Sequence, residues 1–395
     1  MFLSNIDYFL NRITMYRLTL YGLLIIWGWG LAGTITGFLH YSPIDYVVTG
    51  AIIFLLCVGV NAALARLYHA PANIDSTYIT ALILMLIIAP SKPLASIWFI
   101  AGASALAIAS KYLVVIGKKH LFNPAAFGVV VAAIFTHEYA SWWVGTLWMA
   151  PAVAIAGFLI VRKIQRWDAV LAFWICSLTL MLIRAVILNQ RVFSMVWQLV
   201  IDTPWLFLAM VMLTEPSTMP HRRRFRVAYG VLVGVLFAPF FNVLGFFFSP
   251  ELALLVGNAA SYVVSPKEKL ILRLKQKSPA ARSIHSFVFT ASQKFTFEPG
   301  QYMEWTLGHE KSDQRGIRRY FTVASSPTEQ DVIIGVKFYE HASSYKKTLD
   351  ALKPGDTIVA AQPAGDFVLP RSRSQKLAFL AGGIGVTPFR SMAKY

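Results

Sequence analysis

An arginine, an aromatic residue and a hydroxyl lie close together toward the C-terminal end of the chain, at Arg319, Phe321 and Thr322. The planar, charged guanidinium of an arginine can bind a pyrophosphate through paired hydrogen bonds. An aromatic ring offers a face on which a planar heterocycle can stack, and a hydroxyl can form a hydrogen bond near the reactive nitrogen of that heterocycle. These residue types therefore predict a flavin site that continues into Val323, with Thr322 as the residue next to the reacting atoms.

A glycine-rich turn lies nearer the C-terminus, in the run Gly-Gly-Ile-Gly-Val-Thr-Pro at 382–388. The apolar residues at 376–381 predict a short buried strand before this turn, and the residues after it predict the start of a helix. Glycines at such a turn let a dinucleotide phosphate approach the backbone amides. A βαβ unit takes about 30 or more residues, so we expect 375–395 to be the truncated start of an α/β nucleotide-binding domain.

The ordered set of these motifs resembles the ferredoxin-NADP reductase superfamily, whose FAD-binding barrel carries an Arg-x-Tyr-Ser-type motif. On this resemblance Arg319 binds the FAD pyrophosphate, Phe321 stands in the place of the more common tyrosine, and Thr322 supplies the hydroxyl. The resemblance implies an antiparallel β-barrel that binds FAD at 265–374. Alternating apolar residues at 270–275 and 286–290 favour antiparallel strands there.

The same resemblance assigns the remaining nucleotide-binding residues. Ser343 and Ser344 resemble the second phosphate-binding segment of the family, whose amides and hydroxyls could hold the FAD pyrophosphate. The glycine-rich turn resembles the opening of the NAD(P) lobe. The residues assigned to that lobe are Gly382, Gly383, Gly385, Thr387 and Pro388, with the last two near the nicotinamide.

Composition places most of the chain in a membrane, because 56% of its residues are hydrophobic and only 14% are charged, with a mean hydropathy of +0.57. We expect 1–264 to form a polytopic α-helical membrane domain of about ten spans. Several of the apolar stretches are short, which predicts broken or re-entrant helices. The stretches lie at 18–39, 44–65, 76–90, 94–110, 123–137, 146–161, 168–188, 193–214, 227–248 and 251–264.

The basic residues collect on one side of this predicted topology, as is typical of cytoplasmic loops. With the N-terminus inside, only Lys92, Arg184 and Arg191 fall on the other side. We therefore place the N-terminus and the FAD domain in the cytoplasm and the chain in a bacterial-type inner (plasma) membrane. The net charge of +17 is spread over loops beside the spans, so we expect contact with membrane lipid and no nucleic-acid partner.

Two short patterns recur at matching positions of the two halves of the ten spans. Pro-Ser lies at the ends of the third and eighth spans, at 90–91 and 216–217. An Asn-containing motif begins the fifth span, at 122–126, and another lies within the tenth span, at 257–260. Halves with an odd number of helices face opposite ways in the membrane. The pattern predicts an inverted repeat with a site between the halves near the bilayer midplane.

Most of this membrane domain resembles the family of the B-type membrane protein of the sodium-pumping NADH:quinone oxidoreductase and the D-type protein of Rnf complexes. That family carries flavin in its membrane part, often FMN joined to a threonine in a Ser-Gly-Ala-Thr motif, which this chain lacks. A noncovalent second flavin, FMN or riboflavin, near Asn123 and Glu215 is the hypothesis that remains. The matching runs are Gly-Lys-Lys-His-Leu-Phe-Asn-Pro-Ala at 117–125, Met-Leu-Thr-Glu-Pro at 212–216, Pro-Glu at 250–251 and Gly-Asn-Ala at 257–259.

These observations favour a membrane-bound, FAD-dependent NAD(P)H oxidoreductase that passes electrons to a quinone or a redox protein, with other subunits as further partners. Two alternatives stay open: a transporter-like scaffold that anchors a reductase domain, and a ferric or haem-protein reductase. Cys57 and Cys176 cannot supply the four ligands of a usual iron–sulfur cluster, and the histidines form no clear haem-ligand pair. We expect no metal site.

Overall fold

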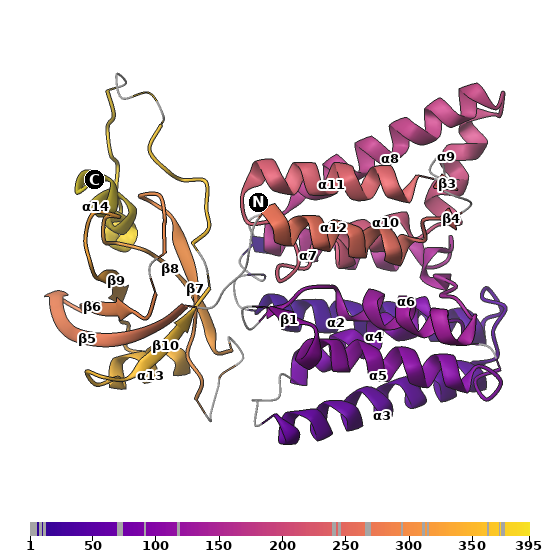
Figure 1. Cartoon of the computed structure of the whole chain (residues 1–395), viewed down its shortest axis with the longest axis horizontal. Coiled ribbons are helices and arrows are strands. Elements are labelled where there is room, and N and C mark those ends of the chain that lie inside the picture. The colour runs from indigo at the N-terminus through magenta and orange to yellow at the C-terminus, as the bar shows by residue number, and fades with distance from the viewer. Residues whose placement is uncertain are drawn as a thin grey trace. The chain divides into compact units, whose positions relative to one another are not determined.

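The computed structural model describes residues 6–7, 10, 13–68, 74–90, 92–116, 119–238, 242–243, 246–264, 270–293, 295–309, 313, 316–361, 363–370, 372 and 376–395. The chain divides into two compact units, Met1–Pro266 and Lys267–Tyr395 (Figure 1). The predicted domain boundaries at 264/265 and 374/375 fall beside or within segments outside the described residues.

The first unit is a bundle of helices (Figure 1). Polar residues begin several of them, as at Thr14, whose side chain accepts a hydrogen bond from the Arg17 amide and caps α2 (Met15–Ile35). The helices that follow are α3 (Pro43–Leu67), α4 (Ile74–Ile87), α5 (Ile97–Leu113), α6 (Pro124–Thr136), α7 (Ala150–Ile164), α8 (Trp167–Ile187), α9 (Val192–Ile201), α10 (Trp205–Phe207), α11 (Arg223–Phe237) and α12 (Pro250–Val264), with the 3-10 turn η1 (Trp143–Gly145), the π-helical turn η2 (Leu208–Met212) and the short strands β1 (Val115–Ile116), β2 (Lys119–His120), β3 (Asn242–Val243) and β4 (Phe246–Phe247).

Among the described residues, 3 helices are long and apolar enough to cross a membrane, namely α2, α3 and α8. A fourth span results if α9 and the segment Trp205–Met212, which are bent by 63° at their junction, count as one broken helix. This bend is the kind of interruption that the short apolar stretches predict. Each predicted stretch contains a helix, but α4, α5, α6 and α12 are shorter than a full span. The number of ten crossings is not confirmed.

The ninth predicted span, 227–248, is wrong at its C-terminal end, because α11 stops at Phe237. Ala238 has φ −71° and ψ 133°, an extended conformation. A residue before proline is disfavoured in helical geometry, and Pro239 follows Ala238. Beyond it β3 and β4 pair as antiparallel strands, Asn242 with Phe247 and Val243 with Phe246.

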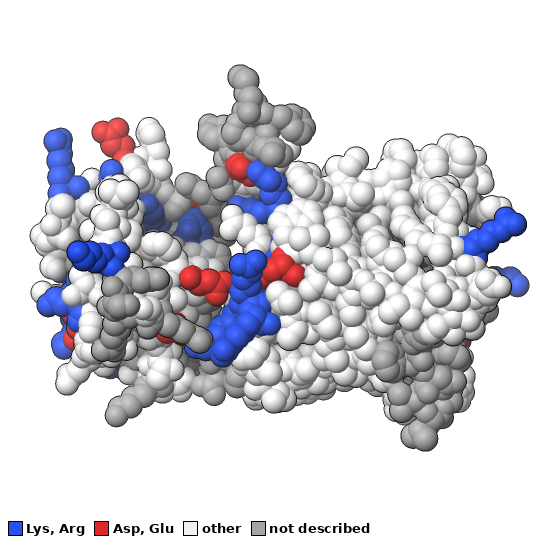
Figure 2. Space-filling view, turned by 90° about the horizontal axis from the view of Figure 1, so that it is seen from above, with Lys and Arg blue, Asp and Glu red and all other residues white. Residues whose placement is uncertain are grey.

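The outer surface of the helical unit exposes large apolar side chains. Ile25, Leu55, Ile155, Ile175 and Val186 lie on four different helices and are between 64% and 73% exposed. Figure 2 shows a broad surface of this unit without Lys, Arg, Asp or Glu. An apolar surface of this extent marks a membrane or partner-binding face. The helical unit is therefore suited to association with a membrane.

Two glycines allow pairs of helices to pack closely inside this bundle. A Cβ added to Gly128 of α6 would clash with the Ala103 oxygen of α5 and would lie 2.7 Å from the Ala107 amide nitrogen. In the other half, a Cβ at Gly230 of α11 would clash with the Ala169 oxygen of α8. Because the glycine of one helix lies against the backbone of the other at both crossings, neither position has room for a larger residue.

The second unit is built on a six-stranded antiparallel sheet (Figure 1). Its strand order is β8-β7-β10-β5-β6-β9. Alternate residues of β5 are buried, as at Leu270, Leu272 and Leu274, which confirms the predicted strands at 270–275 and 286–290. The strands are β5 (Leu270–Ala281), β6 (Ile284–Ala291), β7 (Tyr302–Thr306), β8 (Arg318–Thr322), β9 (Val332–Lys337) and β10 (Thr357–Ala360). The helix α13 (Ser344–Ala351) lies between β9 and β10 in the chain, and the 3-10 turn η3 (Gly383–Val386) and α14 (Thr387–Ala393) follow β10.

The two outer strands of this sheet approach each other where β8 ends. The Ala324 amide donates a hydrogen bond of 2.7 Å to the Ile333 oxygen in β9. No ladder between β8 and β9 is present among the described residues. The structure therefore confirms an antiparallel sheet domain, whereas closure into a complete barrel is not confirmed.

The buried strand predicted at 376–381 is wrong. These residues form no strand, and Leu377 and Leu380 are 48% and 91% exposed. A strand of an α/β domain is buried by neighbouring strands and by helices on both faces. Within the described part of the chain no such layer covers 376–381, so hydrophobicity alone does not make it a strand.

We expect Gly128→Ala to destabilise the helical unit, since overpacking a close contact costs about 1–3 kcal/mol. The matched control is Gly59→Ala in α3, where an added Cβ would meet no atom within 4 Å and alanine favours the helix. The melting temperature of the purified chain in detergent measures both effects. Equal melting temperatures for the two variants would contradict the close crossing of α5 and α6.

Candidate functional site

Arg319 lies in β8, where its guanidinium is held by the neighbouring loop. Its Nη1 donates hydrogen bonds to the Gly316 oxygen at 3.1 Å and to the Arg318 oxygen at 2.6 Å. Its Cζ lies 5.1 Å from the centre of the Tyr345 ring, which is a cation–π distance. These contacts fix a positive charge beside the N-terminal turn of α13.

The N-terminus of α13 is formed by the two predicted phosphate-binding serines. The buried Ser343 side chain caps the helix by accepting a hydrogen bond of 3.3 Å from the Lys346 amide. The Ser344 hydroxyl accepts a hydrogen bond of 2.9 Å from the Asp313 amide and lies 2.9 Å from Nε2 of His309. The first amides of a helix carry partial positive charge and favour an anion.

Arg319 and α13 converge on the Asp313 carboxylate. The Ser344 amide donates a hydrogen bond of 3.0 Å to Oδ2 of Asp313, and Nη2 of Arg319 lies 3.8 Å from Oδ1 of the same carboxylate. The two predicted phosphate-binding elements therefore already share one anionic group. Because a phosphate presents the same kind of oxygen acceptors as a carboxylate, these residues fit a pyrophosphate-bearing cofactor in place of Asp313.

The other residues predicted in the flavin motif divide between the two faces of β8. Phe321 is on the same face as Arg319, half-buried, with its ring centre 6.1 Å from that of Tyr345. Thr322 lies on the opposite face at the strand end. The side chain of Val323 is fully buried in the sheet core, and its amide donates to the Gln301 oxygen at 3.0 Å. Val323 would therefore contact a cofactor through its carbonyl group.

The glycine-rich turn is open to solvent. A Cβ added to Gly382, Gly383 or Gly385 would meet no atom within 4 Å, and Gly383 has a φ of +56°, which favours glycine. The Thr387 hydroxyl donates to the Ile384 oxygen at 3.1 Å, and Pro388 stands in the first turn of α14. The predicted NAD(P)-binding residues thus lie in an accessible turn and at the start of the short helix that follows it.

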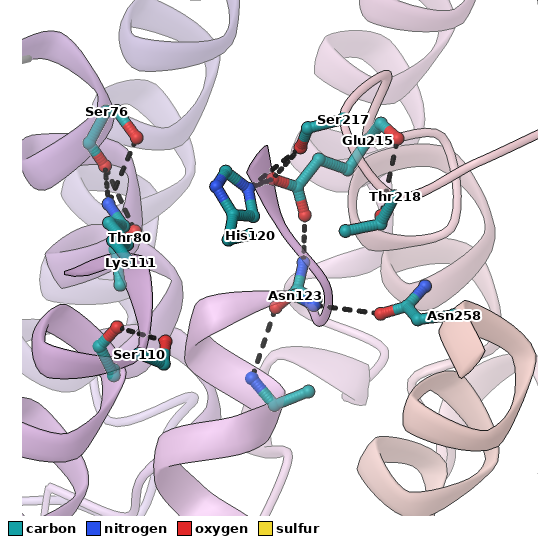
Figure 3. Close-up of polar contacts among 12 residues, drawn as sticks. Ser76, Thr80, Ser110, Lys111, His120, Asn123, Glu215, Ser217, Thr218 and Asn258 are labelled. Atoms are coloured by element: carbon teal, nitrogen blue, oxygen red, sulfur yellow. Dashed lines mark hydrogen bonds and ion pairs between the residues drawn. The ribbon is translucent and has the colours of Figure 1, made fainter. Parts of the chain in front are cut away.

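A polar cluster in the helical unit contains both residues predicted for a membrane flavin (Figure 3). Glu215 lies between His120 and Asn123. Nε2 of His120 is 3.2 Å from Oε1 of Glu215, and Nδ2 of Asn123 donates to Oε2 at 2.8 Å. The Ser217 hydroxyl donates to Oε1 at 2.7 Å. The carboxylate therefore organises side chains that are far apart in the sequence.

Asn123 also joins the two halves of the bundle. Its backbone amide nitrogen donates a hydrogen bond of 2.8 Å to Oδ1 of the buried Asn258 in α12. The side-chain nitrogen of Asn258 in turn donates a hydrogen bond of 3.0 Å to the Tyr229 hydroxyl. Asn123 and Asn258 belong to the two motifs that the sequence relates by the predicted repeat. The structure brings these two motifs into direct contact.

A cavity of about 70 Å³ lies beside this cluster and is lined by Ser76, Thr80, Asn123, Thr214 and Glu215. This volume holds several water molecules. The donors and acceptors of its lining suit the polar edge of a flavin.

Lys111 is a further polar residue near this cavity that the motifs did not identify as a site residue. Its Nζ donates to the Ser76 oxygen at 2.8 Å and to the Ser76 hydroxyl at 3.0 Å (Figure 3). Asp313 was missed as well, because it precedes both phosphate-binding motifs in the sequence and belongs to neither. The predicted span at 94–110 ends before Lys111, whereas α5 continues to Leu113, so only the structure places this charge within an apolar helix.

No model of a known protein family matches the chain. The flavohemoprotein of Candida albicans is 32% identical over 146 residues, which cover 34% of this chain and 35% of that protein. The glycine betaine monooxygenase reductase subunit of Chromohalobacter salexigens is 31% identical over 115 residues, 28% of this chain and 30% of that protein. The chain thus spans about a third of the length of these curated relatives.

Among solved structures, the chain is similar to the flavohem-like FAD/NAD-binding domain of nitric oxide dioxygenase from Vibrio cholerae. That likeness has 19% identity and a TM-score of 0.28 and covers 32% of this chain and 55% of the other. Together with the antiparallel sheet, the sequence relatives support a flavohemoprotein-like reductase domain. The resemblance of the helical unit to membrane proteins of the sodium-pumping oxidoreductase and of Rnf complexes stays a prediction.

We expect Arg319→Ala to weaken FAD binding by roughly 10- to 100-fold, because a hydrogen bond to a charged group contributes about 1.5–3 kcal/mol. Arg318→Ala is the matched control, since its guanidinium pairs with Glu304 at 3.2 Å. Fluorescence titration with FAD measures both variants. Unchanged affinity in Arg319→Ala would contradict the assigned pyrophosphate position.

We expect Asp313→Asn to strengthen FAD binding several-fold, because the variant removes a negative charge that a pyrophosphate must displace. The amide side chain can still accept the hydrogen bond from the Ser344 amide. The same titration, with free pyrophosphate as competitor, measures the change. Weaker binding in Asp313→Asn would instead show that the carboxylate supports the site when FAD is bound.

Proposed function

We propose that the chain is a membrane-bound, FAD-dependent NAD(P)H oxidoreductase. The observation that carries this proposal is the convergence of Arg319 and the first amide of α13 on one anion, in the strand that also carries Phe321 and Thr322. The reductase-type relatives support the same reaction class. The physiological electron acceptor is a redox protein or a quinone.

In this function each residue of the β-sheet unit has a physical role. Arg319, Ser343 and Ser344 hold the pyrophosphate of FAD, and Phe321 supplies an apolar surface for the ring. Thr322 supplies a hydroxyl at the strand end for a hydrogen bond to the reacting edge. The turn at 382–388 binds the nicotinamide nucleotide. When bound, FAD accepts a hydride from NAD(P)H and releases its electrons singly to an acceptor.

The helical unit would place this reaction at a membrane. We propose about ten crossings, the inverted repeat, a bacterial-type inner membrane and a cytoplasmic location for the N-terminus and the FAD domain. The long apolar helices, their exposed apolar surface and the contact between Asn123 and Asn258 support this arrangement. Lipid contacts and additional subunits, as in the complexes that the helical unit resembles, are part of the same proposal.

The polar cluster bears on whether the helical unit carries electrons itself. A second, noncovalent flavin, FMN or riboflavin, near Asn123 and Glu215 is part of the proposal, and the donors and acceptors there support it. A membrane scaffold that anchors the reductase domain is one alternative. The flavohemoprotein relatives favour the other alternative, a haem-protein reductase.

The flavin content of the purified chain tests these functions. We expect one FAD per chain, reduced by NADH or NADPH without oxygen, and loss of this FAD in Arg319→Ala. A second flavin, retained in Arg319→Ala and lost in Glu215→Gln, would establish an electron-carrying helical unit. Absence of FAD in wild-type protein supplied with the cofactor would overturn the proposed function, and haem absorbance would support the haem-protein alternative.

A further inference from the structure

Helix α14 is fastened to the segment that continues directly from the predicted flavin motif. Nη1 of Arg390 donates a hydrogen bond of 2.7 Å to the Ala324 oxygen. The Ser391 hydroxyl, which is fully buried, donates one of 2.6 Å to the Ser325 oxygen. Both acceptors follow Val323 along the chain, so the helix after the glycine-rich turn is anchored to the end of β8.

Glu329 completes this anchor from the loop before β9. Its Oε2 and Oε1 accept hydrogen bonds from Nη1 and Nη2 of Arg390 at 3.0 and 3.1 Å, a two-point contact that fixes the plane of the guanidinium. Oε2 also accepts a hydrogen bond of 2.6 Å from the Ser326 amide. The carboxylate therefore ties the arginine of α14 to the backbone beyond β8.

The hydrogen bonds from Arg390 hold the pKa of the Glu329 carboxyl below its usual value. A carboxyl with a lowered pKa in the folded state stabilises the protein above its ordinary pKa. That contribution is lost as the pH falls through the lowered value. The pair is therefore charged and intact at neutral pH. With Arg390 38% and Glu329 27% exposed, its contribution to stability is at most about 1 kcal/mol.

The N-terminal end of α14 packs against β9, and this packing depends on the position of α14. A Cβ added to Gly335 of β9 would lie 3.1 Å from Cγ2 of Thr387 and 3.4 Å from Cδ1 of Ile384. The missing side chain at Gly335 thus leaves space for the turn to lie directly on β9. A rotation of α14 about its anchor would move Thr387 away from this position.

We propose that Glu329 is a positioning residue for hydride transfer, which holds Arg390 so that the turn at 382–388 keeps a fixed place relative to the flavin-binding strand. This inference rests on the proposed function, since it concerns how the nicotinamide site and the flavin site of one unit are aligned. Glu329 lies outside every motif that the sequence identified. Its carboxylate touches neither substrate nor cofactor in this role and acts through Arg390.

The physical reason is that hydride transfer depends steeply on the distance and angle between donor and acceptor. A misplacement of about 1 Å can reduce a rate by roughly 100-fold. The pair contributes little to global stability, but it controls the orientation of a short helix whose N-terminal turn carries the predicted nicotinamide residues. Losing the pair should therefore lower the rate of flavin reduction much more than it lowers the melting temperature.

The test compares Glu329→Gln with Asp331→Asn in the complete chain. Asp331 is the matched control, because its carboxylate lies in the same loop and pairs with Lys275 at 2.8 Å without touching α14. The first measurement is amide hydrogen exchange of 382–392 without cofactors. The second is the FAD dissociation constant, and the third is the anaerobic rate of flavin reduction at saturating NADH or NADPH.

We expect Glu329→Gln to increase hydrogen exchange at 382–392, to leave the FAD dissociation constant unchanged and to slow flavin reduction at least about 10-fold. Asp331→Asn should match wild type in all three measurements. Arg390→Lys, which keeps the charge but loses the two-point contact, should slow reduction to an intermediate extent. These results would separate positioning from binding.

Equal exchange and equal reduction rates in Glu329→Gln and Asp331→Asn would overturn the proposal. A lower FAD affinity in Glu329→Gln would overturn it as well, because the residue would then act on the flavin site itself. If the wild-type chain binds no FAD, the proposed function fails. Hydrogen exchange then still decides whether Glu329 holds the turn.

Discussion

The candidate nucleotide site depends on the placement of one negative charge between two groups that attract anions. The Asp313 carboxylate accepts a hydrogen bond from the first amide of α13 and lies 3.8 Å from the Arg319 guanidinium. Without an anion at this point, the guanidinium and the positive end of the helix would face each other without compensation. The same balance explains why a pyrophosphate is a suitable replacement for the carboxylate.

In the helical unit a second carboxylate, that of Glu215, has a role comparable to that of Asp313. Glu215 accepts hydrogen bonds from Asn123 and Ser217, and Asn123 contacts Asn258 in the other half of the bundle. Polar groups buried among apolar helices stabilise only when their partners are in place. The two units thus share a physical principle, in which an acidic side chain aligns donors from distant segments.

Local sequence predicted the elements with regular patterns well. Alternating apolar residues identified β5 and β6, and long apolar stretches located the helices of the first unit. The errors arose where the hydrophobicity of a segment was interpreted without the residues that pack against it or interrupt it. The stretch at 376–381 is apolar but exposed, because no described layer covers it, and 227–248 ends early, since Pro239 makes the residue before it extended.

The sequence by itself determined the residue types of the site: Arg319, Phe321 and Thr322 in one strand, two serines that begin α13, and glycines in an accessible turn. These follow from local chemistry, because strand alternation, helix capping and turn geometry act over a few residues. Only the tertiary structure showed that Asp313 joins Arg319 to α13 and that Glu329 holds Arg390. Such pairs are set by strand register and loop path, which bring together residues without any spacing rule between them.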